Sequence, residues 1–222
     1  MKRLWFALVS ACLSPVVVAG QVTGQQDVSA RLAGHVPPAV VAQVQGLADT
    51  AVVRGLPVDP LVNKALEGAV KGAPPDRIVA AVRTVLQQLD LASDALRPVG
   101  VTSANAIEAG AFAIAAGLDS GQVATVARSA DRAHPAATAL QVVATLVALG
   151  VPPGRGVGLV QATIRAGEPL GDLVSLPSRL QVAMAGGLPP AAAAEGLERA
   201  ALNHLTPKAQ GHGKGQGNPH RP

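Results

Sequence analysis

Side chains that could carry acid–base or nucleophilic chemistry are few in this chain and widely separated. Cys12 is the only cysteine, and no Gly-x-Ser-x-Gly motif is present to hold a serine nucleophile on a tight turn. His35, His134 and His204 fall at predicted helix boundaries. We interpret His134, which follows Asp131 by one helical turn, as a helix-terminal residue that interacts with the helix dipole, with a general base as the alternative. The sequence predicts that this protein is not an enzyme.

Carboxylates occur in two pairs with the spacing of neighbours on a helix, Asp90 with Asp94 and Glu195 with Glu198. Such pairs can bind a metal or divide the roles of acid and base. An arginine lies close to each pair in the sequence. We therefore interpret both pairs as solvated helix faces.

Glu108 differs from these acids because it lies in an otherwise apolar segment. Asn105 precedes it by one helical turn, and Phe112, the single aromatic residue after position 6, follows it by another. A buried carboxylate needs a partner or a shifted pKa. A hydrogen-bonded structural acid or an exposed position at a rim is the simpler interpretation. A buried polar functional site formed by Glu108 and Asn105 is the more speculative one.

Two further segments could bind ligands. The glycine-rich run 153–158 precedes a helix, where a phosphate can bind, but it lacks the Gly-Lys-Ser/Thr ending of a P-loop and no strand precedes it. Near the end of the chain, His212, Lys214 and His220 could bind a divalent metal weakly or contact a partner. The wide spacing of these histidines is not a ligand motif. We predict neither a metal site nor a cofactor.

Residues 1–20 have the pattern of a secretory signal peptide. Lys2 and Arg3 are followed by an uncharged apolar stretch over 4–13 and by small residues over 18–20. Cleavage near Gly20 would deliver the chain to the periplasm or outside the cell. An alternative is a bacterial lipobox over 9–12, in which Cys12 would be lipidated.

The positive charge of the chain belongs to its ends. The net charge is +4, yet five of the 18 Lys and Arg residues lie at positions 2, 3, 208, 214 and 221, so that residues 21–207 carry a net charge of −1. Proteins that bind nucleic acid cluster Lys and Arg on one face, and those that bind single strands add aromatic stacking platforms. Neither feature occurs here, which argues against a nucleic-acid partner.

Apolar residues recur at helical spacing, and regularly placed glycines separate the helical segments. Helices are predicted over 38–54, 59–71, 76–90, 103–116 and 135–149. The same interval separates Gly55 from Gly72, Gly100 from Gly117, and Gly150 from Gly167, and Pro, Asp or Thr follows most of these glycines. The spacing predicts an all-α fold of antiparallel hairpins built from helices of about 12 residues. Longer intervals over 72–100 and 167–187 break the rhythm, so both a solenoid-like stack and a compact bundle remain open.

The domain organisation follows from composition. Residues 21–36 are polar and rich in glutamine and are predicted to form a flexible arm before a single helical domain over 37–206. The tail 207–222 has almost no apolar residue and is predicted to be disordered. The helix 135–149 is nearly all apolar but too short to cross a bilayer, so we expect it to be buried on all sides and expect no transmembrane segment after signal removal.

These patterns predict an exported, non-catalytic helical-repeat protein that acts as an interaction or scaffold protein of a bacterial envelope. Its partner would be a protein or an envelope polymer. The alternative is a carrier that holds an apolar small molecule or lipid in an interior lined by Ala and Val.

Overall fold

The chain folds into helices throughout residues 28–203, the part that this computed structural model describes, and no strand occurs there. The prediction of an all-α fold is confirmed. A helical turn over 28–32 comes first. The helices that follow are α2 (Pro38–Val53), α3 (Asp59–Val70), α4 (Pro75–Leu96), α5 (Ala104–Ala116), α6 (Ser120–Ser129), α7 (Ala136–Ala148), α8 (Pro153–Arg165), α9 (Leu170–Ala185) and α10 (Pro190–Asn203). A 3₁₀ turn, Arg97–Val99, extends α4.

Glycines end most of these helices and proline or aspartate begins most of them, as the spacing indicates. At the end of α5, Gly117 has φ +113°, a backbone conformation in which a Cβ would be strained. Its N–H donates to the Ile114 carbonyl at 3.0 Å, and the Leu118 N–H donates to the Ala113 carbonyl at 3.0 Å. This satisfies carbonyls that the helix leaves unpaired. Asp119 then caps α6 by accepting the Gln122 N–H at 2.8 Å.

Helix lengths depart from the expected value of about 12 residues where the regular interval between glycines is interrupted. Helices α3, α5, α6, α7 and α8 have 10 to 13 residues, but α4 has 22. In α4 the buried positions continue at helical spacing from Ile78 through Leu86 and Leu89 to Leu96. Because that apolar face is unbroken and no glycine interrupts it, the long interval over 72–100 holds one long helix.

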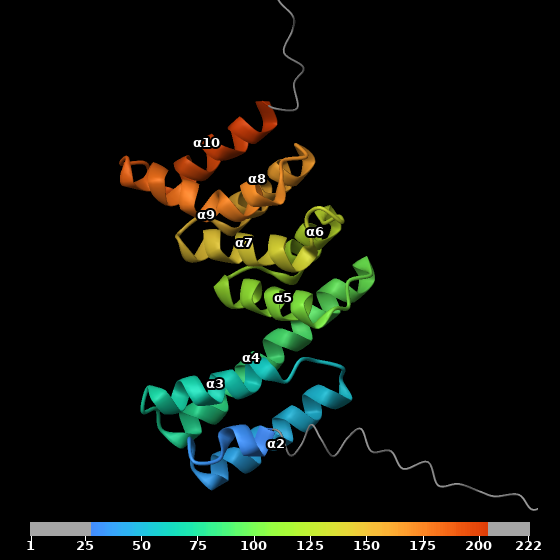
Figure 1. The fold of residues 1–222 in the computed structure, drawn as a ribbon, viewed down its shortest axis with the longest axis vertical. Helices are drawn as coiled ribbons and strands as arrows, with labels where there is room; N and C mark the ends of the chain where they lie inside the picture. The colour runs from blue at the N-terminus through green and yellow to red at the C-terminus, as the bar shows by residue number, and fades with distance from the viewer. Residues whose placement is uncertain (1–27, 204–222) are drawn as a thin grey trace, which may run out of the picture.

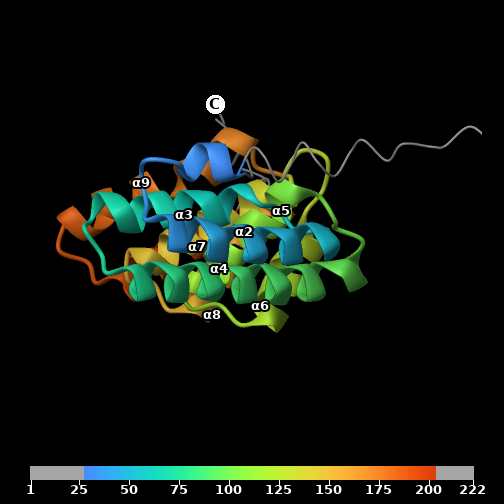
Figure 2. The same ribbon diagram turned by 90° about the horizontal axis from the view of Figure 1, so that it is seen from below.

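The helices lie across the longest axis of the molecule, one above another (Figures 1 and 2). Successive contacts join α2 to α4, α4 to α6, α6 to α8 and α8 to α10. A second series joins α5 to α7 and α7 to α9. The apolar core runs between these two series and consists mostly of Leu, Val and Ala side chains.

Part of the predicted flexible arm belongs to this core. Val28, Leu32 and Val36 are buried, and Arg31 pairs with Asp59 at the start of α3. The prediction of an arm over 21–36 is therefore wrong for 28–36, because apolar residues at helical spacing form a buried face there. The predicted signal peptide over 1–20 with Cys12, residues 21–27, and the tail 207–222 with His212, Lys214 and His220 lie outside the described residues.

Helix α7 packs against α5, α6, α8 and α9, yet it is not buried on all sides. Leu140, Val143 and Leu146 are fully buried, whereas Gln141 is exposed. The expectation of complete burial is wrong because polar residues form a narrow outer face on this helix. None of the described helices combines the length and the apolar character needed to cross a membrane.

Candidate functional site

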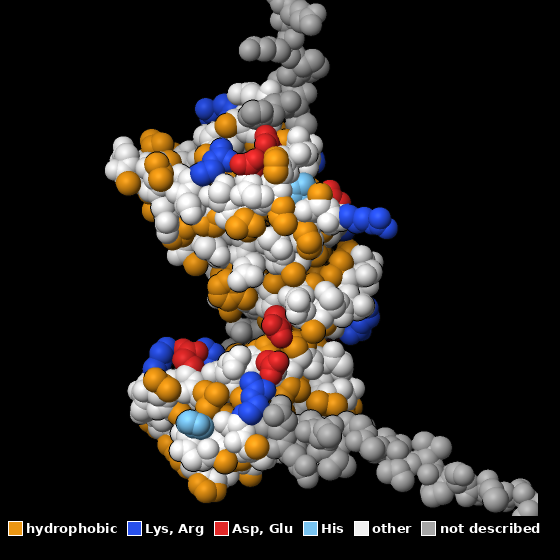
Figure 3. Space-filling model, in the orientation of Figure 1, with side chains coloured by type: hydrophobic (Ala, Val, Ile, Leu, Met, Phe, Trp, Pro, Cys, Tyr) orange, Lys and Arg blue, Asp and Glu red, His pale blue; other side chains and the backbone are white. Residues whose placement is uncertain are grey.

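A cleft opens between α3 and α5, which do not pack closely against each other as α5 and α7 do. We call it the α3–α5 cleft. It consists of two adjoining hollows, of about 580 Å³ and about 260 Å³, that share Pro60, Asn63, Glu108 and Phe112. The larger volume lies in the range of about 300–1,000 Å³ usual for ligand sites. Figure 3 shows the surface hollowed at this level of the molecule.

The length of α4 opens the cleft. Near its start, Ile78 packs closely against α3 at Gly68. A Cβ added to Gly68 would lie only 2.9 Å from the Ile78 side chain. Near its end, Ala92 packs against α5 at Gly110. A Cβ added to Gly110 would lie 3.0 Å from the Ala92 Cβ. Because α4 holds α3 and α5 at its two ends, one face of its middle turns borders the smaller hollow through the partly exposed Val85 and Gln88, with the buried Leu89 behind them.

Both residues of the predicted polar site lie at the α3–α5 cleft. Asn105 is exposed and Glu108 is half-buried, and both line the larger hollow. Asn63 of α3 and Gln141 of α7 line the same hollow. Glu108 therefore lies at the rim of a cleft with polar side chains from three helices around it.

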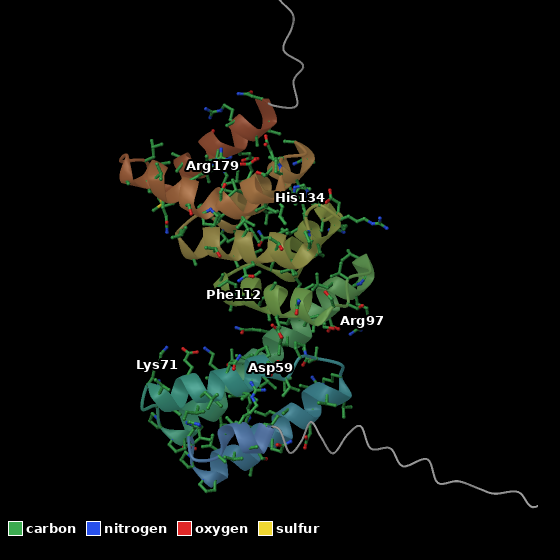
Figure 4. All side chains as sticks on the ribbon, in the orientation of Figure 1. Asp59, Lys71, Arg97, Phe112, His134 and Arg179 are labelled. Carbon is green, nitrogen blue, oxygen red and sulfur yellow. The ribbon has the colours of Figure 1, made fainter. Side chains whose placement is uncertain are left out.

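An apolar surface adjoins these polar groups. Phe112 is 48% exposed although it is the single aromatic residue among the described ones. In the smaller hollow it lies with Val85, Leu89 and Ala115. Figure 4 shows Phe112 on α5, at the level above Asp59 and Lys71. An aromatic ring that is partly exposed to solvent beside hydrogen-bonding groups is a common feature of binding surfaces.

Among the described charges around the cleft, the acids other than Glu108 are paired. Glu67 accepts hydrogen bonds from Lys64, at 2.7 Å, and from Lys71, and these two cations hold the pKa of the Glu67 carboxyl at about 2. Asp59 is paired with Arg31. Glu108 makes no hydrogen bond or ion pair within the described residues. Burial raises the pKa of the Glu108 carboxyl, and the negative charge of Asp59 raises that pKa further.

The raised pKa of Glu108 predicts a pH-dependent stability. The folded state holds this proton more tightly than the unfolded chain, whose pKa is near 4.5. Stability therefore falls as pH rises from 4.5 through the raised folded pKa. Glu108→Gln removes this loss, so the variant gains stability over the wild type at about pH 7 but not at about pH 4. Urea unfolding at the two pH values measures the gain, and Glu195→Gln on α10 is the control. An equal effect of Glu108→Gln at both values would contradict the prediction.

His134 has a structural role other than the expected one. Helix α6 ends at Ser129, so His134 is not helix-terminal but lies in the loop before α7. It is buried, its Nε2 lies 2.6 Å from the Glu168 carbonyl and its Nδ1 lies 3.1 Å from Asp131 Oδ1. The His134 backbone N–H also donates to Asp131 and lowers the pKa of that carboxyl. Both ring nitrogens thus have partners: Nδ1 contacts Asp131 within the same loop, and Nε2 joins this loop to the one between α8 and α9.

The remaining candidates lie in ordinary structural settings. Asp90 pairs with Arg54, Asp94 with Arg97, and Glu195 with Arg199. In the glycine-rich run, Gly156 faces α7, where a Cβ would lie 3.3 Å from the Val143 side chain. That glycine allows α7 and α8 to approach closely. Within residues 28–203, no group of three or more His, Cys, Asp or Glu side chains is placed to hold a metal ion.

Asn63 and Gln141 were not among the predicted site residues. In the sequence, each is a polar residue on a helix that is otherwise rich in apolar ones. They line the cleft because α3, α5 and α7 are neighbours in the fold. The spacing of residues in the sequence does not show which helices lie side by side. The long interval without a glycine over 72–100 is the signal that could have located the cleft.

The chain matches no protein-family model, and the comparisons with curated proteins and with solved structures give no match.

Proposed function

We propose that this protein is a non-catalytic interaction protein and that the α3–α5 cleft is its binding surface. The observation that carries the proposal is the convergence at this cleft of polar side chains without partners among the described residues and a half-exposed Phe112. Aromatic rings that become fully buried at an interface contribute more binding energy than most interface residues. The cleft supplies such a ring with hydrogen-bonding groups beside it.

The proposal includes a solenoid-like arrangement of helical hairpins. Two series of helix contacts support it, α2 to α4 to α6 to α8 to α10 and α5 to α7 to α9. In such an arrangement the first hairpin carries α3 and the next carries α5. The length of α4 then separates α3 from α5 and leaves the cleft as an interruption in one helical layer.

Partner retention by paired variants tests the binding role. Immobilised full chain is incubated with an envelope fraction of the native host, and retained proteins are quantified. Phe112→Ala is expected to lower retention of the partner by about tenfold or more, as the loss of an aromatic anchor does. Leu91→Ala is the matched control, because Leu91 lies on α4 outside the cleft with 49% exposure. Equal retention by wild type and both variants would contradict the proposal.

A carrier of an apolar small molecule is the second candidate. The smaller hollow favours it, because Val85, Leu89, Ala111, Phe112 and Ala115 give it an apolar wall. Native mass spectrometry of protein purified from its host distinguishes the two functions. A carrier retains a discrete added mass that Phe112→Ala releases, whereas an interaction protein shows the mass of the chain alone.

Export to the periplasm or the cell exterior is part of the proposal and is supported by the sequence of 1–20. A partner in that compartment would be an envelope protein or an envelope polymer. The net charge of −1 over 21–207 argues against a nucleic-acid partner, because nucleic acids are bound mainly by positive charge. It favours a partner that is recognised by shape and hydrogen bonds.

A further inference from the structure

Three carboxamide side chains line the larger hollow of the α3–α5 cleft, each from a different helix. Asn63 comes from α3, Asn105 from α5 and Gln141 from α7. None of these side chains makes a hydrogen bond within the described residues. A carboxamide presents an N–H donor and a carbonyl acceptor side by side. These groups match the C=O and N–H that an extended peptide leaves free along its backbone.

The cleft also offers a carboxylate, that of Glu108, which makes no ion pair within the described residues. Lys64 lines the smaller hollow, but its ammonium group is held by Glu67. Lys71 is held by the same carboxylate. Glu108 lines both hollows and has no ion-pair partner in the described chain. A ligand that brings a positive charge would therefore neutralise the uncompensated charge of Glu108.

Phe112 lies one helical turn from Glu108 on the same face of α5. Lys and Arg side chains have an apolar stem and a charged head. The stem can cover an exposed ring while the head reaches a carboxylate, and a guanidinium is also attracted to the face of an aromatic ring. The neighbouring ring and carboxylate are thus suited to one basic side chain.

We propose that the α3–α5 cleft binds an extended peptide segment that carries a basic side chain. The carboxamides of Asn63, Asn105 and Gln141 pair with its backbone, and the basic side chain lies along Phe112 to reach Glu108. The inference rests on the proposed function and names the chemistry of its partner. An uncharged oligosaccharide would also satisfy the carboxamides, but it would leave the Glu108 charge without a counterion.

Binding of defined peptides to the full chain tests the inference. The probes are pools of fluorescent, acetylated and amidated decapeptides whose central residue is fixed as Arg, Gln or Glu, and fluorescence anisotropy measures their affinity. We expect the Arg pool to bind about tenfold or more tightly than the Glu pool, with the Gln pool between them. Peptides with N-methylated backbone amides, which lack N–H donors, should bind more weakly than the matched unmethylated ones.

Charge reversal locates the preference at one residue. Glu108→Lys is expected to invert the order of the Arg and Glu pools. Glu195→Lys makes the same change on α10, at a carboxylate that pairs with Arg199, and should leave the order unchanged. Circular dichroism of both variants verifies that each is folded. A preference for Arg that persists in folded Glu108→Lys would overturn the inference.

Different results would overturn the binding role of the cleft and its preference for a basic peptide. If no peptide pool binds while retention of an envelope protein still depends on Phe112, the binding role stands and the extended basic peptide is wrong. If an envelope polysaccharide is retained through Phe112 in place of a protein, the peptide inference is also wrong. If neither peptide binding nor retention depends on Phe112, both proposals are wrong.

Discussion

Replacing Gly110 with leucine is expected to destabilise the fold by about 3 kcal/mol, the upper part of the range for overpacking a core. A Cβ at Gly110 would lie 3.0 Å from the Ala92 Cβ, 3.4 Å from Leu96 and 3.5 Å from Val123. These neighbours belong to α4 and α6, so a larger side chain must push α5 away from both helices. The expected loss is read from the midpoint of urea unfolding monitored by circular dichroism.

Gly46→Ala is the matched control for Gly110→Leu. Gly46 also lies inside a helix, α2, but an added Cβ would meet nothing within 4 Å there. The alanine should stabilise the protein by up to about 1 kcal/mol, because it lowers the conformational entropy lost by the helix on folding. If Gly110→Leu unfolded at the wild-type urea concentration, the close packing of α5 on α4 would be wrong.

His134→Ala is expected to cost about 2–4 kcal/mol of stability, because it removes buried hydrogen bonds and leaves a cavity. The ring joins the loop before α7 to the loop after α8 through the Glu168 carbonyl at 2.6 Å. Without it, that interaction between the two loops is lost. Thermal and urea unfolding measure the effect, and hydrogen exchange should show faster opening of residues 130–135 and 166–169.

Two further variants separate the contributions of His134. His134→Phe keeps an aromatic ring in the space but loses the hydrogen bonds, so its cost should fall between wild type and His134→Ala. His35→Ala is the control at an exposed histidine and should change stability by less than about 0.5 kcal/mol. Equal stability of His134→Ala and wild type would contradict the bridging role.

Most helix ends could be predicted from the sequence because they depend on local chemistry. A glycine in the left-handed conformation or a proline in a first turn acts within a few residues of its own position. The helical turn over 28–32 was missed because its buried residues, Val28 and Leu32, lie next to the glutamine-rich segment, whose composition suggested an arm. The helical spacing of its apolar residues was the better guide there.

The cleft could be predicted only in part. Glu108 and Asn105 were identifiable because they are polar residues in an otherwise apolar segment. Such residues suggest a polar environment that their own helix does not provide. Asn63 and Gln141 were not, because an amide on an amphipathic helix has the same sequence pattern on any surface. The break in the glycine rhythm over 72–100 counted against a regular repeat, and it is this interval that holds α4 and separates α3 from α5.

Photo-crosslinking from inside the α3–α5 cleft shows whether a partner binds there. A photoreactive phenylalanine analogue replaces Phe112 in the full chain, and a second chain carries the same analogue at Leu91. We expect the analogue at position 112 to crosslink a protein partner through a contiguous segment that contains Lys or Arg. The analogue at position 91 should give only background. Equal crosslinking of that partner from both positions, or crosslinking from position 91 alone, would contradict the assignment of the α3–α5 cleft as the binding surface.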